Sequence, residues 1–339
     1  MINRRDFLHT MGVLALAPSA CARDEQESTD ALVNDIHSQL NPTRVADIVT
    51  PESVQSVRDA LQRAAREGRA VSIAGGRHAM GAQQFGTNTI HLDTRGLNRV
   101  LNFDQENGTI EVEAGIQWPE LVEAYLDAQE GQERQWGIAQ KQTGADRLCI
   151  GGSLAANAHG RVLTRKPMVA DVESFTLVDA DGEVRHCSRE ENAELFALAI
   201  GGYGLFGVIA TVTLRLVPRQ KVERVVEVIT AEDLIMSIDQ RVADGFLYGD
   251  FQFAIDPHTD DFLHRGVFSC YRPIDPSTPI DANPRVLSED DWRSLLTSAH
   301  TNKTESFERY VEHYLSTSGQ VYWSDTNQMS TYLDHYHGP

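Results

Sequence analysis

The chain has 339 residues, of which 41% are hydrophobic, with 30 lysines and arginines against 49 aspartates and glutamates. This length and composition predict a globular protein of two domains and argue against a collagenous, disordered or disulfide-rich chain. The formal net charge of −19 repels phosphate backbones and anionic lipid surfaces. We therefore expect no nucleic-acid partner and a small neutral molecule as substrate.

The opening of the chain has the pattern of an export signal. Arg4 and Arg5 begin a twin-arginine pattern, an apolar run follows over residues 11–17, and small residues close the segment at residue 22. The apolar run is too short to span a bilayer. We predict export by the twin-arginine route to the periplasm or the outside of the cell, with membrane attachment only if Cys21 is lipidated.

Three further cysteines, Cys149, Cys187 and Cys270, stand far apart in the sequence. Because no CxxC pair occurs, they predict neither a zinc site nor a disulfide framework. We expect buried thiols and no bound metal.

The first predicted elements alternate between strand and helix. Residues 23–43 are polar with little periodicity, which is typical of a linker, so the fold is expected to begin near Val45. A strand over residues 45–49, a helix over residues 54–65 and a strand over residues 70–74 follow. A glycine-containing turn comes directly after the second strand.

The middle of the chain predicts a hairpin and two more glycine-rich segments. An Asn-Gly pair at residues 107–108 separates two strand-like stretches, and a short helix is expected over residues 118–126. Residues 149–160 consist largely of glycine and alanine, too small to be chosen for core volume. The third glycine cluster lies between a predicted helix over residues 193–199 and a predicted strand over residues 208–217.

Three glycine clusters indicate that something approaches the backbone closely, because glycine loses more conformational freedom on folding than other residues. Backbone amides in tight turns can bind a pyrophosphate without lysine. For any single cluster, an ordinary turn is the competing interpretation.

The common nucleotide-binding and zinc motifs do not fit this sequence. Gly202, Gly204 and Gly207 spell GxGxxG, but they follow a helix and precede a strand, the reverse of a dinucleotide-binding fingerprint. A P-loop and the HExxH motif of zinc hydrolases are both missing from the sequence.

Taken in order, these motifs resemble the FAD-binding domain of the vanillyl-alcohol-oxidase family, the PCMH-type domain, over residues 44–218. The resemblance implies an α+β fold in which two α/β subdomains grip FAD, followed by an α+β substrate domain over residues 219–339. We expect that second domain to be incomplete, because the sequence stops at Pro339 without a closing element. The acidic and basic groups of related enzymes come from a later stretch, so no catalytic residue is named. Four residues near the terminus are expected to be packing or surface residues and not catalytic ones: Tyr332, His335, Tyr336 and His337.

The first motif, residues 73–83, is similar to the family's pyrophosphate loop. In many members the residue at the place of His78 bonds to the 8α carbon of the flavin, and a neutral imidazole is a nucleophile able to form that bond. Ala79 and Ala82 depart from the family's pattern, which has serine and glycine there, while Gln83 falls where some members contact the flavin. The FAD contacts predicted in this loop are Gly75, Gly76, Arg77, His78, Ala79 and Gln83.

The second motif, residues 151–160, is similar to the family's second FAD segment, whose small side chains let the backbone line the flavin. Its His-Gly pair matches the sugar and aldonolactone oxidase branches, and His159 is either a polar lining residue or a structural one. Cys149 lies too close to Gly151 to match the second covalent cysteine of the berberine-bridge branch, so a single link is predicted. The contacts predicted here are Cys149, Gly151, Gly152, Ser153, Ala156, His159 and Gly160.

The third motif begins at Leu195 and resembles the family's end-of-domain signature, in which the main chain at the place of Ile209 meets the flavin. The family implies an FAD-dependent oxidase or dehydrogenase that moves a hydride from a CH–OH carbon of a sugar-derived alcohol or aldonolactone to flavin N5. Electrons then pass to oxygen or another acceptor. A covalent link through His78 would make the flavin more oxidising.

Two other functions stay open at this point. The first is a cytokinin-dehydrogenase-like or berberine-bridge-like flavoenzyme that acts on an amine or a phenolic alcohol. The second is a non-catalytic flavin-binding remnant, because an incomplete substrate domain would leave the flavin exposed.

Overall fold

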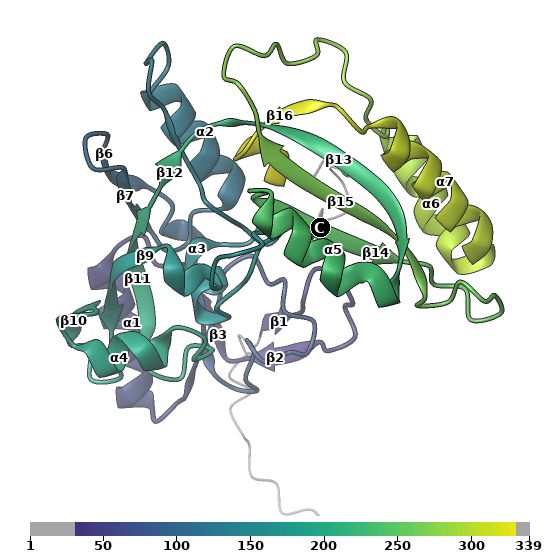
Figure 1. Cartoon of the computed structure of the whole chain (residues 1–339). Coiled ribbons are helices and arrows are strands. Elements are labelled where there is room, and N and C mark those ends of the chain that lie inside the picture. The colour runs from purple at the N-terminus through teal and green to yellow at the C-terminus, as the bar shows by residue number, and fades with distance from the viewer. Residues whose placement is uncertain (1–30, 330–339) are drawn as a thin grey trace, which may run out of the picture.

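The computed structural model describes residues 31–329, which form two lobes (Figure 1). The first lobe, coloured purple to teal, ends with strand β12, and the second, coloured green to yellow, begins with strand β13. Helices and sheets occur in both lobes, which confirms the predicted α+β class. The predicted export signal with Cys21 lies outside the described residues, as do Tyr332, His335, Tyr336 and His337.

A parallel three-stranded sheet and one helix open the first lobe. The sheet order is β3 (Asp47–Val49), β5 (Ile90–Asp93), β4 (Val71–Ala74). Helix α1 (Val54–Glu67) begins with a capping box at Ser53 and ends at Gly68, whose φ of 63° suits the left-handed cap. Val57 and Leu61 lie on its buried face and pack against the strands, as the apolar spacing predicted.

The polar segment before this sheet belongs to the fold. Strand β1 (Ala31–Val33) pairs antiparallel with β2 (Thr43–Val45), and Val33 is buried. Asp35 is buried as well, and its carboxylate accepts hydrogen bonds from the backbone N–H groups of the turn that follows it. The linker predicted for residues 23–43 is therefore wrong over its described part. Its polar side chains satisfy a tight turn instead of facing solvent.

A five-stranded antiparallel sheet forms the other half of the first lobe. In sheet order its strands are β10 (Val184–Ser188), β9 (Val172–Val178), β11 (Val208–Arg215), β7 (Thr109–Glu113) and β6 (Val100–Asp104). The predicted hairpin joins β6 to β7, with Gly108 at φ 69°. Its helices are α2 (Trp118–Ala128), α3 (Ile150–Ala155) and α4 (Ala193–Ala199), and the short strands β8 (Trp136–Gly137) and β12 (Val217–Pro218) pair beside them. Tyr125 and Phe196 pack into the core of this half.

The second lobe is a four-stranded antiparallel sheet with helices on both faces (Figure 1). Its strands, in sheet order, are β14 (Tyr248–Phe253), β15 (Arg265–Pro273), β13 (Lys221–Thr230) and β16 (Val321–Trp323). Helix α5 (Ala231–Ala243) packs on the face that carries Phe268 and Cys270. Helix α7 (Lys303–Ser316), which α6 (Glu289–Thr301) accompanies, packs on the opposite face against Val226 and Val267. Of these elements the sequence analysis missed α5, α7, β15 and β16.

The last described residues of the second lobe form hydrogen bonds with the first lobe. Asp325 is fully buried, and its carboxylate accepts hydrogen bonds from the hydroxyl of Tyr125 in α2 and from Nε of Arg219 between the lobes. Gln328 accepts a hydrogen bond from the backbone N–H of Lys141, 187 residues away in the chain. The described helices include none long and apolar enough to cross a membrane.

Candidate cofactor site

The first lobe encloses a cavity of about 650 Å³ between its two halves. Three segments distant in sequence form its wall: the loop after β4, the stretch around α3, and the turn that leads into β11. These are the three glycine-rich segments found in the sequence. The volume lies in the range of sites for sizeable ligands.

Gly75 and Gly76 bring the backbone of the first loop close to the opposite wall. A Cβ atom on Gly75 would lie 2.7 Å from Cβ and Sγ of Cys149, and one on Gly76 would lie 2.4 Å from the carbonyl oxygen of Arg147. Real Cβ atoms do not approach so closely. Only glycine fits at both positions, and the next residue, Arg77, adopts a left-handed φ of 55°.

Helix α3 supplies the second wall. A Cβ atom on Gly151 would lie 2.8 Å from Cβ of Ala114, whereas one on Gly152 would meet no protein atom within 4 Å. The side chain of Ser153 accepts a hydrogen bond from Nε1 of Trp118, which ties the helix to α2. The helix therefore packs through one glycine and presents the other to open space.

The described wall of this cavity has no carboxylates. Among residues 31–329, its lining includes no aspartate and no glutamate, although the chain carries a net charge of −19. Arg77 lines the cavity and its Nε is buried with no hydrogen-bond partner among the described residues. A diphosphate would supply the missing acceptor. Around Arg77 the wall is apolar, with Ile73, Leu148 and Ile209, and this suits a planar ring system. The residues present therefore fit FAD.

Two histidines meet at the edge of the cavity. Nε2 of His37 lies 3.0 Å from Nδ1 of His78, and both side chains line the cavity. The other edge of the His78 ring packs over Gly76, where a Cβ atom would lie 2.9 Å from Cδ2. His78 is thus held from both sides.

Burial keeps the thiol of Cys149, which lines the cavity, in its protonated form. Desolvation raises the pKa of Cys149 to about 12, so the thiol stays protonated near neutral pH. A protonated, buried thiol is a poor nucleophile.

A buried lysine fixes a loop that the sequence analysis did not assign to the site. The ammonium group of Lys141 donates hydrogen bonds to the carboxylate of Asp146, at 2.6 Å, and to the backbone oxygen of Gln142. Gln142 and Gly144 line the cavity. Burial lowers the pKa of Lys141 while Asp146 opposes that shift.

Most of the predicted contacts line this cavity. Those that do are Gly75, Gly76, Arg77, His78, Ala79, Gln83, Cys149, Gly151, Gly152, Ser153, Ala156 and Ile209. His159 and Gly160 do not: His159 is exposed, and Gly160 packs against the backbone of Lys141. Sequence reasoning missed His37, because a histidine in a polar stretch gives no signal of the loop it will meet.

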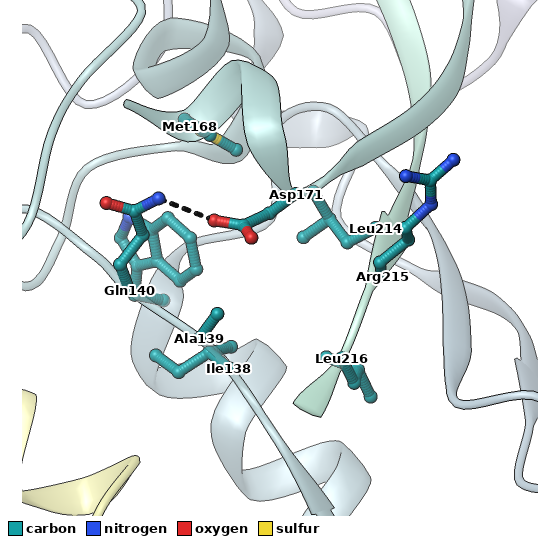
Figure 2. A pocket seen from close by; sticks show the side chains of 9 residues that line it. Ile138, Ala139, Gln140, Met168, Asp171, Leu214, Arg215 and Leu216 are labelled. Carbon is teal, nitrogen blue, oxygen red and sulfur yellow. Dashed lines mark hydrogen bonds between the residues drawn. The ribbon is translucent and has the colours of Figure 1, made fainter. Parts of the chain in front are cut away.

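A second, much smaller cavity of about 10 Å³ lies beneath this loop (Figure 2). Gln140 points into it and donates a hydrogen bond of 2.7 Å to the carboxylate of Asp171, whose other oxygen accepts one from Arg165. Burial raises the pKa of Asp171. The space is about the size of one water molecule. We assign Gln140 and Asp171 a structural role, because their hydrogen bond fixes the chain beside Lys141.

Two further arginines contact the second lobe: Arg161 reaches it from the first lobe, and Arg224 lies within it. Arg161 donates hydrogen bonds to Asp250 in β14, to the hydroxyl of Tyr271 in β15 and to the backbone oxygen of Asn327. Arg224 in β13 donates to the same tyrosine hydroxyl at 2.9 Å. The contacts of Arg161 join the two lobes, whereas that of Arg224 lies within the second lobe. The described residues contain no cluster of three or more potential metal ligands.

Comparison with known proteins agrees with this geometry. Residues 45–188 match a family described as an FAD binding domain. The chain is 29% identical over 212 residues to the L-gulonolactone oxidase of Bos taurus, covering 62% of this chain and 46% of that protein. It is 28% identical over 247 residues to the L-gulono-1,4-lactone dehydrogenase of Mycobacterium tuberculosis, covering 72% and 53%. The chain thus spans about half the length of these relatives.

A cytokinin dehydrogenase of Oryza sativa, numbered 9, is 27% identical over 213 residues, covering 60% of this chain and 37% of that protein. Among solved structures, a mutant of cholesterol oxidase from Brevibacterium sterolicum has a TM-score of 0.67 at 15% identity, covering 90% of this chain and 62% of that one. At this identity the likeness shows the fold.

The fold, the cavity and the matched residues define an FAD-binding protein with an α+β architecture. Residues 45–188 carry the match to an FAD binding domain, and the chain is similar to an L-gulonolactone oxidase and an L-gulono-1,4-lactone dehydrogenase, in line with the resemblance found in the motifs.

Proposed function

We propose that this chain is an FAD-dependent oxidoreductase that oxidises the CH–OH group of a sugar-derived alcohol or an aldonolactone. The observation that carries the proposal is the cavity walled by three glycine-rich segments, with no carboxylate among its described lining residues and with His78 at its edge. The names of the bovine and mycobacterial relatives support this class of substrate.

When bound, FAD accepts a hydride at N5 while the hydroxyl proton leaves, so the CH–OH group becomes a carbonyl, and oxygen or another acceptor takes the two electrons. The chain supplies position and charge. Arg77 would neutralise the diphosphate, and the close-packed backbone at Gly76 and Gly151 would keep water from it. The apolar side chains of Leu148 and Ile209 would hold the ring.

We further propose that the flavin is attached covalently through His78. Its side chain lines the cavity and its ring is held by His37 and Gly76. The protonated thiol of Cys149 argues against a second link. The link is tested by precipitating the full chain with acid: wild type should retain fluorescence on the polypeptide, and His78→Ala should release it.

Export by the twin-arginine route also belongs to this proposal. Its support is the run of sequence from Arg4 to residue 22. A membrane anchor would depend on lipid at Cys21. Fractionation of cells expressing wild type and Arg4→Lys with Arg5→Lys tests both points: loss of export in the double variant is expected, and unchanged export would contradict the route.

Anaerobic reduction of the bound flavin tests the substrate class. We expect L-gulono-1,4-lactone or an alditol to bleach the visible absorption of the full chain, with colour returning when oxygen is admitted. Bleaching by a cytokinin-type amine instead would favour the second candidate, which the rice relative supports. Bound flavin that no alcohol, lactone or amine reduces would contradict an enzymatic function and favour a flavin-binding remnant.

A further inference from the structure

The third glycine-rich segment holds one aromatic side chain at the cofactor cavity. Tyr203 lines the cavity although it is 62% exposed. Among the lining residues within 31–329, it is the only one with a phenyl or indole ring. A flat ring at the open side of a cavity offers a stacking surface to a flat group of a ligand.

Close packing fixes the backbone of this turn. A Cβ atom on Gly202 would lie 2.2 Å from the carbonyl oxygen of Leu198, so only glycine fits there. The backbone N–H of the next residue, Tyr203, donates a hydrogen bond of 3.0 Å to the carbonyl oxygen of Ala155, at the end of α3. The fold therefore sets where Tyr203 stands.

Tyr203 adopts a backbone conformation that its side chain disfavours. Its φ is 51°, in the left-handed region where glycine or asparagine is preferred and bulky residues are rare. Because the ring is mostly exposed, the chain itself gives little packing energy in return. Disfavoured backbone conformations of this kind gather at ligand sites. A ligand group that stacks on the ring would supply the missing contact.

Tyr203 and the loop that carries His78 contact opposite ends of helix α3. The loop meets the start of the helix, because Gly75 packs against Cys149. Tyr203 meets its end, at Ala155. With a rise of 1.5 Å per residue, the two contacts are about 9 Å apart along the helix. A ring system bound beside His78 therefore leaves the end of the cavity at Tyr203 for a second group.

Between these two ends, α3 presents open space to the cavity. Gly152 lines the cavity, and a Cβ atom there would meet no protein atom within 4 Å. FAD consists of two flat ring systems, a flavin and an adenine, joined through a diphosphate. With the flavin beside His78, as proposed above, a diphosphate that passes Gly152 would bring the adenine to Tyr203.

We propose that Tyr203 binds the adenine of FAD by stacking its ring on the purine, and that this contact favours the dinucleotide over FMN. The inference rests on the position of the flavin proposed above. Stacking requires a π face and no particular hydrogen bond, so the phenol hydroxyl is dispensable and other adenosine diphosphates should bind at the same end of the cavity.

The test measures the affinity of the full chain for FAD, ADP and FMN by calorimetric titration. The parent and all variants carry His78→Ala, so that flavin is held without a covalent link and can be removed by dialysis. Tyr203→Ala, Tyr203→Leu and Tyr203→Phe are compared with this parent, and urea unfolding checks that each variant folds. Leu205→Ala is the matched control, because Leu205 is 83% exposed in the same turn and does not line the cavity.

We expect Tyr203→Ala and Tyr203→Leu to bind FAD and ADP about tenfold more weakly than the parent, a usual loss for one stacked base. Tyr203→Phe keeps the ring and should bind both ligands as the parent does. The affinity for FMN, which has no adenine, should be the same in the parent and in all variants. Leu205→Ala should match the parent for every ligand.

The outcomes separate this inference from the proposed function. Parent-like affinity for ADP in Tyr203→Leu would overturn the stacking role and leave FAD binding intact, as would a parent that binds FAD but not ADP. A loss for FMN as large as that for ADP would place the flavin at Tyr203 and overturn it too. If Tyr203→Ala fails to fold, the comparison of leucine with phenylalanine still decides. A wild-type chain and a parent that bind no flavin would contradict the proposed function itself.

Discussion

The cofactor cavity and the junction between the two lobes differ in how they use charged side chains. In the cofactor cavity, backbone forms much of the wall, because a side chain at Gly75 or Gly76 would collide with its neighbours, and the lining residues within 31–329 include no carboxylate. The junction with the second lobe depends on long side chains: Arg161 meets the half-buried carboxylate of Asp250, and Arg219 meets the buried carboxylate of Asp325.

This difference shows how an acidic protein keeps a site for an anionic ligand. Although the chain has 49 acidic residues, the described residues of this wall include none of them, so its polar groups are backbone dipoles, Arg77, histidines and uncharged side chains such as Gln83 and Gln142. The junction keeps its acidic groups because each has a cation of its own. Cofactor binding should therefore respond to small steric changes, and the junction to changes of charge.

The largest effect is expected at the junction. Asp325→Asn keeps the shape of the side chain but leaves the guanidinium of Arg219 buried without a counter-charge, which should lower the free energy of unfolding by about 3 kcal/mol or more. Urea unfolding measures it. Glu289→Gln breaks an exposed pair with Arg293 and should cost less than about 1 kcal/mol. Equal losses in the two variants would contradict the role of burial.

A single methyl group should abolish most of the affinity for FAD. In Gly76→Ala the new Cβ would lie 2.4 Å from the carbonyl oxygen of Arg147, and the shift needed to relieve this contact opens the cavity wall. We expect affinity for FAD to fall by about a hundredfold, equivalent to about 2.8 kcal/mol. Titration of FAD fluorescence measures it.

The matched control is Gly131→Ala, at a glycine with φ 72° and no neighbour within 4 Å of the new Cβ. It imposes the backbone strain of a left-handed residue far from the cavity. Its affinity for FAD should stay at the wild-type value. Loss of affinity in the control would mean that general destabilisation, not the cavity wall, explains the Gly76 result.

Removing the cation that bridges the lobes should have an intermediate effect. Arg161→Met deletes hydrogen bonds to Asp250, Tyr271 and Asn327, and should lower the free energy of unfolding by about 2 kcal/mol. FAD affinity should change little, because Arg161 does not line the cavity. Urea titration measures the free energy of unfolding, and fluorescence titration measures the affinity for FAD. A larger loss in the free energy of FAD binding than in that of unfolding would contradict separate roles for the cavity and the junction.

The smallest effect is a dependence of stability on pH that comes from His91, a buried histidine in strand β5 of the first sheet. Burial lowers the pKa of His91 to about 4, so the unfolded chain takes up a proton near pH 6.5 that the folded chain does not. The stability from neutral His91 is complete above that pH and is lost as pH falls toward 4. Between pH 6.5 and 5.5 the loss should be about 1 kcal/mol, and His91→Asn should lack it in urea titrations at the two pH values.

The cofactor wall was predictable because its signals are local. Gly75, Gly76 and His78 lie within four positions, and the structure shows that glycine is required there by contacts with Cys149 and Arg147. The hairpin at residues 107–108 and helix α4 follow from turn and apolar patterns in the same way.

What the sequence did not reveal depends on distant partners. His37 lies 41 positions from His78, and Asp325 lies 200 positions from Tyr125. Nothing in the local sequence marks them as buried contacts. Helix α5 was also missed. It has no fully buried residue and contacts the sheet through the partly buried Leu234 and Ile238. The exposed His159 matched a motif in sequence, but the chain turns away from the cavity after Ala158.

The central claim is that the cavity of the first lobe holds FAD with its ring at His78. Mass spectrometry of peptides from the proteolysed full chain tests it most directly. We predict one FAD adduct on the peptide that contains His78 and an unmodified peptide containing Cys149. An unmodified His78, with flavin absent or attached to another peptide, would contradict the account.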